Sequence, residues 1–153
     1  MENSRKNLNL LLELAVRDLS QAENRLAAAN HQMNESRKQQ GLLEQYREDY
    51  MSRHQTTLNS GMSGWDLNNY NTFISNLDQA IVKHERVMNE YSQTIERYTK
   101  AWQECQKKKR SYEVLIDRNR IAQYKVESRI EQKLMDEFSS NQRRFLQSHA
   151  ESI

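Results

Sequence analysis

The chain has 153 residues, of which 36% are hydrophobic and 29% charged, with no proline and a formal net charge of +2. Such a polar chain has too few apolar side chains for an ordinary globular core, and a coiled coil, whose buried surface is a narrow seam, suits it better. The single cysteine, Cys105, excludes an internal disulfide, and no apolar run approaches the roughly 20 residues that a membrane-spanning helix needs.

The first predicted element is a helix over residues 5–56. Apolar or small side chains recur there in alternating steps of four and three, which is the spacing of a coiled-coil seam. The seam positions are Leu8, Leu12, Ala15, Leu19, Ala22, Leu26, Ala29, Met33, Ser36, Gln40, Leu43, Arg47 and Tyr50. Small residues at many of these positions allow a second helix to approach closely. Gly41 is expected to weaken this helix by about 1 kcal/mol relative to alanine.

A turn-like segment follows over residues 57–65 and contains the other two glycines, Gly61 and Gly64. Ser63 stands three residues before Asp66, a spacing that resembles a capping box and indicates the start of a second helix. We therefore expect the chain to reverse near residue 61, so that position i pairs with roughly position 122 − i.

The second predicted helix covers residues 66–148, and its seam is the clearer of the two. The repeat selects Leu67, Tyr70, Ile74, Leu77, Ile81, His84, Met88, Tyr91, Ile95, Tyr98, Trp102, Cys105, Lys109, Tyr112 and Ile116. Only His84 and Lys109 interrupt the apolar series. A strict repeat of this length keeps one face turned towards a partner helix. The predicted fold is all-α: a long two-helix antiparallel coiled-coil hairpin that forms a single coiled-coil domain over residues 1–153.

With this pairing, the second helix passes the beginning of the first helix near residue 119. Beyond about residue 119 it should therefore be unpaired and form an overhanging C-terminal helical tail. Apolar residues continue there in steps of four, at Ala122, Val126, Ile130, Leu134 and Phe138. Each step of four residues turns the side-chain direction by roughly 40° about the helix axis, so these side chains wind around the helix. A surrounding collar or several partners could cover them, and fraying or self-association is the alternative.

The residue types needed for catalysis or metal binding do not gather in the sequence. The four histidines His31, His54, His84 and His149 are far apart, and no glycine-rich phosphate loop is present. Cys105 falls on the seam, where a cysteine is more often a small apolar filler than a nucleophile. We predict a protein that is not an enzyme and needs no cofactor or metal.

Positive charge is concentrated towards the carboxyl end, where residues 106–153 carry eleven basic and seven acidic side chains. The run from Lys107 to Arg110 is typical of a solvated helix face, although nucleic acid or an acidic protein surface could also bind it. Glu113 and Asp117 follow at once, and no array of base-stacking aromatic residues accompanies the run. We therefore expect no nucleic-acid partner, and a basic helical nucleic-acid-binding protein is the alternative.

A second stripe overlaps the second seam. It consists of Phe73, Leu77, Ala80 and His84, in steps of four, three and four. These residues could simply widen the core face. Alternatively, Phe73 and Ala80 could lie at the edge of the seam and form an exposed anchor for a protein partner.

Several blocks of residues outside the seam occur in the same order as in a known protein family. They are Tyr46 with Tyr50, residues 59–64 before Trp65, Asn69-Tyr70 with Phe73-Ile74, Ala101-Trp102, and residues 132–138. Over nearly its whole length the chain resembles the FliJ family of cytoplasmic components of the flagellar type III protein-export apparatus. The block 132–138 is the most specific part of this resemblance, because seam residues alone would match many coiled coils.

The resemblance implies a stalk similar to that of rotary ATPases, with both chain ends inside the hexameric ring of the export ATPase. It also implies binding to the cytoplasmic region of the export gate protein FlhA, promotion of proton-driven export, and recycling of export chaperones. Such a protein would be cytoplasmic and peripherally associated with the inner-membrane export apparatus. The stalk of a virulence-type III secretion system, which has a similar shape, is a further alternative.

The resemblance also assigns two sets of site residues. Phe73, Leu77, Ala80 and His84 match, in identity and spacing, a family stripe that contacts the gate, which favours the anchor interpretation. Leu134, Met135 and Phe138 in the overhanging tail are assigned to ATPase binding. The first helix is less similar to the family, so no amino-terminal contact residues are assigned.

Overall fold

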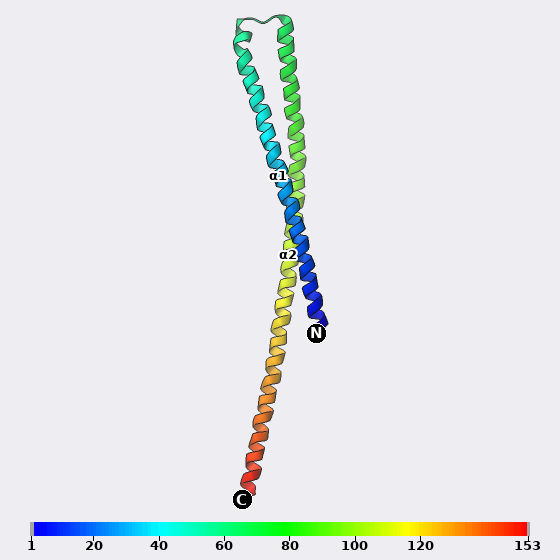
Figure 1. Cartoon of the computed structure of the whole chain (residues 1–153), viewed down its shortest axis with the longest axis vertical. Coiled ribbons are helices and arrows are strands. Elements are labelled where there is room, and N and C mark those ends of the chain that lie inside the picture. The colour runs from blue at the N-terminus through cyan, green and yellow to red at the C-terminus, as the bar shows by residue number, and fades with distance from the viewer. Residues whose placement is uncertain (1, 153) are drawn as a thin grey trace. The chain divides into compact units, whose positions relative to one another are not determined.

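The computed structural model describes residues 2–152, which form two long α-helices and, within that range, no β-strand. Helix α1 covers Glu2–Ser60 and helix α2 covers Gly64–Glu151. The chain reverses between them, as the colours from cyan to green show in Figure 1. The predicted all-α helical hairpin is confirmed.

The connection between the helices, residues 61–63, is shorter than the predicted loop of residues 57–65. The first helix continues to Ser60, whose hydroxyl donates to the backbone carbonyls of Thr56 and Thr57, 2.9 and 3.2 Å away. Gly61 then leaves the helix with a φ of 99°, in the left-handed region that favours glycine. The Ser63 hydroxyl accepts a hydrogen bond from the Asp66 amide at 3.2 Å, so the predicted serine cap starts α2 at Gly64, two residues earlier than expected.

The described residues fall into two units. The hairpin unit is residues 17–106, and the terminal unit is residues 2–16 together with 107–152. In the hairpin unit, every predicted seam position of α1 from Leu19 to Tyr50 is buried or half-buried, and the residues between them are exposed. Tyr70 is the buried residue on the α2 side of this seam. The seam predicted for α1 is therefore confirmed.

The seam of α2 is confirmed from Tyr70 onwards, where each predicted position in the hairpin unit is buried or half-buried. Leu67 is the exception and is 40% exposed. It lies in the first turn of α2, beside the point where α1 ends, so little of the other helix is available to cover it.

Hydrogen bonds between the helices of the hairpin unit reveal the register. Gln32 donates to the Tyr91 hydroxyl at 3.1 Å, and the Trp102 indole N–H donates to the Glu23 carboxylate at 3.3 Å. Both pairs agree with the predicted antiparallel pairing about residue 61. Because a shift by one residue would separate these donors from their acceptors, the bonds help to fix the register.

The middle of the α1 seam is polar. Gln40 is buried, and its amide nitrogen donates to Glu44 at 3.2 Å and Glu85 at 3.5 Å, while its amide oxygen has no partner among the described residues. Nearby, the Arg47 guanidinium donates two hydrogen bonds to the Asp78 carboxylate, which raises the pKa of Arg47. Polar groups at seam positions can specify register at a cost in stability, which is the role we assign to this segment.

In the terminal unit, burial ends part-way along α2. Leu8 and Leu12 are half-buried and Ala15 is buried, whereas on α2 the last half-buried residue is Gln123. Every residue from Tyr124 to Ser152, which we call the tail, is exposed. Within this unit, α2 runs on beyond the first described residue of α1 (Figure 1). Neither helix contains, within residues 2–152, an apolar stretch sufficient to cross a bilayer.

Candidate protein-binding sites

The stripe that the family resemblance assigns to gate binding, which we call the gate stripe, lies on α2 in the hairpin unit and consists of Phe73, Leu77, Ala80 and His84. Steps of four, three and four place these side chains within an arc of about 60° on the helix. Ala80 is exposed, and the other three are half-buried. The stripe therefore lies at the edge of the seam, partly covered by α1 and partly open to a partner.

Phe73 belongs to an aromatic cluster close to the connection. Its ring centroid lies 4.2 Å from that of Tyr50 and 6.0 Å from that of Tyr46, one turn away on α1. Tyr50 also stacks on Tyr70 at 5.6 Å and contacts the His54 ring at 4.2 Å. Phe73 is thus held between two tyrosines of α1, and a substitution there should affect the stability of the hairpin as well as any binding.

His84 has a direct bond to the other helix. Its Nε2 lies 2.7 Å from the backbone carbonyl oxygen of Ser36, so this nitrogen carries a hydrogen and donates it. The contact fixes the ring against α1 and leaves one edge of a half-buried side chain at the surface. Ala80 remains the member of the stripe with the most accessible position.

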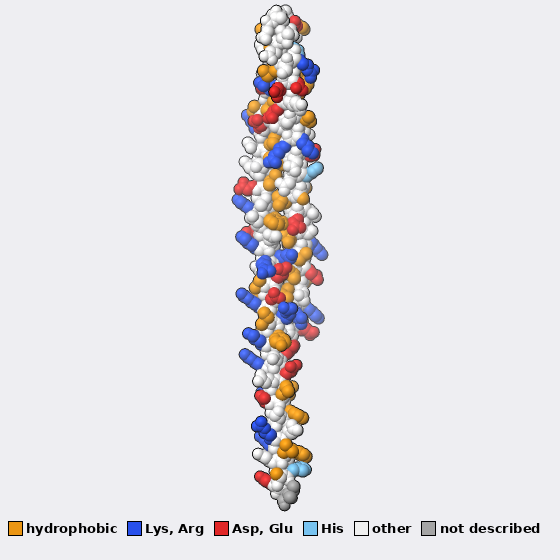
Figure 2. Space-filling model, turned by 90° about the vertical axis from the view of Figure 1, so that its left-hand side faces the viewer, with side chains coloured by type: hydrophobic (Ala, Val, Ile, Leu, Met, Phe, Trp, Pro, Cys, Tyr) orange, Lys and Arg blue, Asp and Glu red, His pale blue; other side chains and the backbone are white. Residues whose placement is uncertain are grey.

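The residues assigned to ATPase binding all lie on the tail. Leu134 is 59% exposed, and Met135 and Phe138 are each 71% exposed. At 100° per residue, their side chains share an arc of about 100°. Figure 2 shows hydrophobic side chains along one edge of the lower end of the molecule, where the tail lies.

Two further apolar residues of the tail continue the same side of the helix. Phe145 and Leu146 are 60% and 61% exposed. The sequence analysis followed apolar residues in steps of four, and this series ends at Phe138. It therefore did not include Phe145 or Leu146. A step of seven from Phe138, the repeat of the seam itself, would have found Phe145.

The opposite side of the tail is charged. Its exposed side chains are Lys133, Asp136, Glu137, Arg143 and Arg144. The tail is therefore an amphipathic helix whose apolar side is uncovered in the single chain. An exposed apolar surface of this kind makes the tail a candidate site of interaction with another protein.

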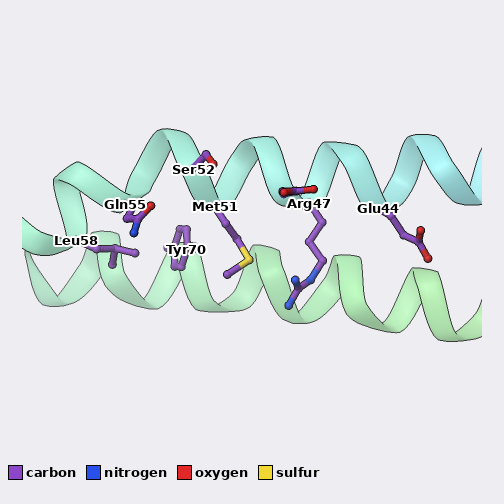
Figure 3. A pocket seen from close by; sticks show the side chains of 8 residues that line it. Glu44, Arg47, Met51, Ser52, Gln55, Leu58 and Tyr70 are labelled. Atoms are coloured by element: carbon purple, nitrogen blue, oxygen red, sulfur yellow. The ribbon is translucent and has the colours of Figure 1, made fainter.

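A shallow groove of about 490 Å³ lies between the helices near the connection, lined by Glu44, Arg47, Glu48, Met51, Ser52, Gln55, Leu58 and Tyr70. Arg47 and Met51 reach across from α1, and Tyr70 points back from α2 (Figure 3). The lining combines the apolar side chains of Met51 and Leu58 and the Tyr70 ring with polar and acidic ones, and Arg47 is paired with Asp78.

Comparison with known proteins decides the family. The family model described as Flagellar FliJ protein matches residues 4–148. The chain belongs to the FliJ family. A Flagellar FliJ protein from Salmonella typhi is 28% identical over 132 residues, which cover 86% of this chain and 90% of the relative. One from Escherichia coli strain K12 is 26% identical over the same length and coverage.

The FliJ match confirms the resemblance drawn from the sequence blocks. It includes both candidate surfaces, since the gate stripe and the apolar side of the tail lie within residues 4–148. The relatives named here are flagellar proteins, which favours the flagellar interpretation over a virulence-type secretion stalk.

Proposed function

We propose that this FliJ-family protein is a non-catalytic component of the flagellar type III export apparatus. It acts as a stalk within the hexameric ring of the export ATPase, couples the ring to the gate protein FlhA, and recycles export chaperones. It works in the cytoplasm, peripherally associated with the inner-membrane apparatus. The observation that carries this proposal is the tail, in which every residue from Tyr124 to Ser152 is exposed.

The shape of the apolar surface on the tail supports a ring as the partner. Val126 and Ile130 are 48% and 54% exposed, and with Leu134 and Phe138 they wind around the helix in steps of four. A single straight helix would cover only some of them. A collar that surrounds the tail could contact all of them, which is the arrangement of a stalk inside a ring.

Truncation tests the role of the tail. Removing residues from 126 onwards should leave the hairpin folded and abolish stimulation of the ATPase, because every residue from Tyr124 to Ser152 is exposed in the single chain. Phe138→Ala should reduce stimulation, whereas Ser140→Ala, on the charged side, should retain it. Circular dichroism and thermal melts check the fold. If the truncated chain lost helicity in residues 2–125 or melted much earlier, the tail would be part of the fold instead.

The gate stripe is tested best at Ala80. Ala80→Asp places a charge on an exposed position of the stripe and should weaken binding to the cytoplasmic region of FlhA and reduce motility. Stimulation of the ATPase should persist, because substitutions with no shared contacts usually act independently. The matched control is Ala28→Asp, which makes the same substitution at an exposed position of α1 and so changes helix propensity equally. Equal gate affinity of both variants would contradict the assignment.

The other stripe residues also contact α1, so their effects on binding need a stability control. Phe73→Ala, Leu77→Ala and His84→Ala should each weaken gate binding, and each should also lower the melting temperature. Binding is therefore compared at a temperature where all variants are folded by circular dichroism. If stimulation of the ATPase fell together with gate affinity, the two sites would not be independent.

The basic run from Lys107 to Arg110 gives little support to nucleic-acid binding. The Glu113 carboxylate lies 3.8 Å from both Lys109 and Arg110, so part of the positive charge is compensated. Affinity for DNA or RNA measured against salt concentration would test this, since phosphate binding weakens steeply as salt rises. Tight binding at physiological salt would contradict the proposed function.

A further inference from the structure

In the terminal unit, the charged side chains of α2 are divided between two sides of the helix. At 100° per residue, a row of cations that we call the basic stripe lies within an arc of about 80°. It consists of Lys107, Arg118, Lys125, Arg129 and Lys133, all of which are exposed. No acidic residue between positions 107 and 133 falls in this arc. Figure 2 shows Lys and Arg side chains one above another along the left edge of the molecule.

The acidic side chains of the same segment lie on the other side of the helix. They are Glu113, Asp117, Glu127 and Glu131, which also share an arc of about 80°. The centres of the two arcs are roughly 160° apart around the helix axis. The segment from residue 107 to residue 133 therefore has one basic and one acidic side.

The ion pairs follow this division. The other cations of the segment that lie near the acidic side are compensated: Lys109 and Arg110 are each 3.8 Å from Glu113. Arg120 is 3.7 Å from Asp117. The last four residues of the basic stripe form no such ion pair within residues 2–152. The stripe is therefore the side of α2 on which positive charge is left uncompensated.

The stripe also carries a repulsion that an anionic partner would relieve. Lys125, Arg129 and Lys133 follow one another in steps of four, and like charges at this spacing destabilise a helix. The first helix does not cover them. The half-buried seam positions of the segment, from Tyr112 to Gln123, are centred about 110° from the stripe. The stripe is thus open along its whole length.

The geometry of the stripe favours a fluid anionic surface over a nucleic acid. The five cations extend over roughly 40 Å of one continuous helix at 1.5 Å per residue, at uneven intervals of eleven, seven, four and four residues. Lipid headgroups diffuse laterally and can gather under unevenly spaced charges. The backbone of a DNA duplex instead winds away from a straight helix within about half of its 34 Å turn. The arc contains no aromatic side chain that could stack on single-stranded bases.

We propose that the basic stripe binds the anionic phospholipid surface of a membrane, with α2 lying along the plane of the bilayer. Each cation close to such a surface adds to the attraction, and salt weakens it. Leu115, which is 44% exposed, and Ala122 lie in the same arc and would meet the headgroup region. The proposal rests on the terminal unit alone and goes beyond the proposed function. A ring around the tail would also cover the stripe, so the lipid-bound chain is one that has not yet entered a ring.

Co-sedimentation of the full chain with vesicles tests the proposal. Binding should be strong to vesicles of phosphatidylcholine mixed with phosphatidylglycerol, weak to phosphatidylcholine alone, and should fall steeply as salt rises. Phe138→Ala should bind the mixed vesicles like the wild type, because Phe138 lies on the other side of the tail. Equal binding to both kinds of vesicle, or none to either at low salt, would overturn the proposal.

A pair of double variants separates the stripe from net charge. Lys125→Gln with Arg129→Gln should bind the mixed vesicles about 25-fold more weakly, at about fivefold for each cation. The matched control, Arg110→Gln with Arg120→Gln, removes the same charge from exposed positions outside the stripe and should change the affinity little. Circular dichroism checks that both variants are folded. Equal weakening by the two double variants would mean that binding follows net charge alone, and would overturn the proposal.

An environment-sensitive fluorophore tests which side of α2 meets the membrane, in a chain where the native cysteine is replaced by Cys105→Ser. The label on Ala122→Cys, within the arc of the stripe, should shift its emission to shorter wavelength when mixed vesicles are added. The label on Tyr124→Cys, which is exposed on the other side, should not shift. Equal shifts at both positions would contradict the orientation. A short DNA duplex that bound more tightly than the vesicles, with the same loss in Lys125→Gln with Arg129→Gln, would assign the stripe to nucleic acid instead.

Discussion

The hairpin unit and the tail contain similar apolar residues in opposite surroundings. Tyr70 in the hairpin unit is 8% exposed, whereas Tyr124 in the tail is 72% exposed, and Met33 and Met135 differ in the same way. Both regions are regular helix, so secondary structure does not separate them. The difference is whether a second helix of the same chain covers the side chain. Apolar residues therefore stabilise the hairpin unit and remain available for a partner in the tail.

The contrast should be largest for tyrosine, which both regions contain. Tyr70→Ala removes a buried ring from the aromatic cluster and should lower the free energy of unfolding by about 3 kcal/mol or more. Tyr124→Ala removes an exposed ring and should change it by no more than about 0.5 kcal/mol. Urea unfolding followed by circular dichroism measures both. Similar losses for the two variants would mean that the tail is packed in solution.

Histidine gives a smaller contrast. His84→Ala removes the donor to the Ser36 carbonyl and should lower the free energy of unfolding by about 1–2 kcal/mol. His149, whose ring lies 4.3 Å from that of Phe145 in the tail, contacts no other helix. His149→Ala should therefore be nearly neutral in the same urea titration. A neutral His84→Ala would show that the hydrogen bond contributes little to the hairpin.

A substitution at Gly41 should stabilise the hairpin unit and so sharpen its comparison with the tail. The helix α1 runs through this residue, and a Cβ atom added there would have no other atom within 4 Å. Gly41→Ala should thus raise the free energy of unfolding by about 0.5–1 kcal/mol through helix propensity and a less flexible unfolded chain. Thermal melting checks the sign. A lower melting temperature would indicate that the helix needs the flexibility of glycine at this position.

The smallest effect is expected at the ion pair between Arg47 and Asp78, whose side chains are 35% and 49% exposed. A double-mutant cycle with Arg47→Met and Asp78→Asn should give a small favourable coupling energy, which falls as salt is added because both side chains are partly exposed to solvent. The same cycle at high salt is the control. A coupling energy that salt does not change would mean that the pair is effectively desolvated.

The sequence by itself determined the helices, the seam and the point of reversal. The reason is that a strict alternation of three and four residues leaves one face for burial, and Gly61 with Ser63 ends one helix and starts the next. The blocks outside the seam, from Tyr46 to residues 132–138, identified the family, because their order is not required by a coiled coil.

Only the tertiary structure decided what each side chain of the gate stripe contacts. Spacing places Phe73 and Ala80 at the same edge of the seam, but it cannot tell that Tyr46 and Tyr50 bracket Phe73 while Ala80 stays exposed. The bond from His84 to the Ser36 carbonyl likewise depends on how closely two backbones approach. Periodicity determines which face of a helix turns inwards, whereas the depth of burial is set by the size of the side chains that lie opposite on the other helix.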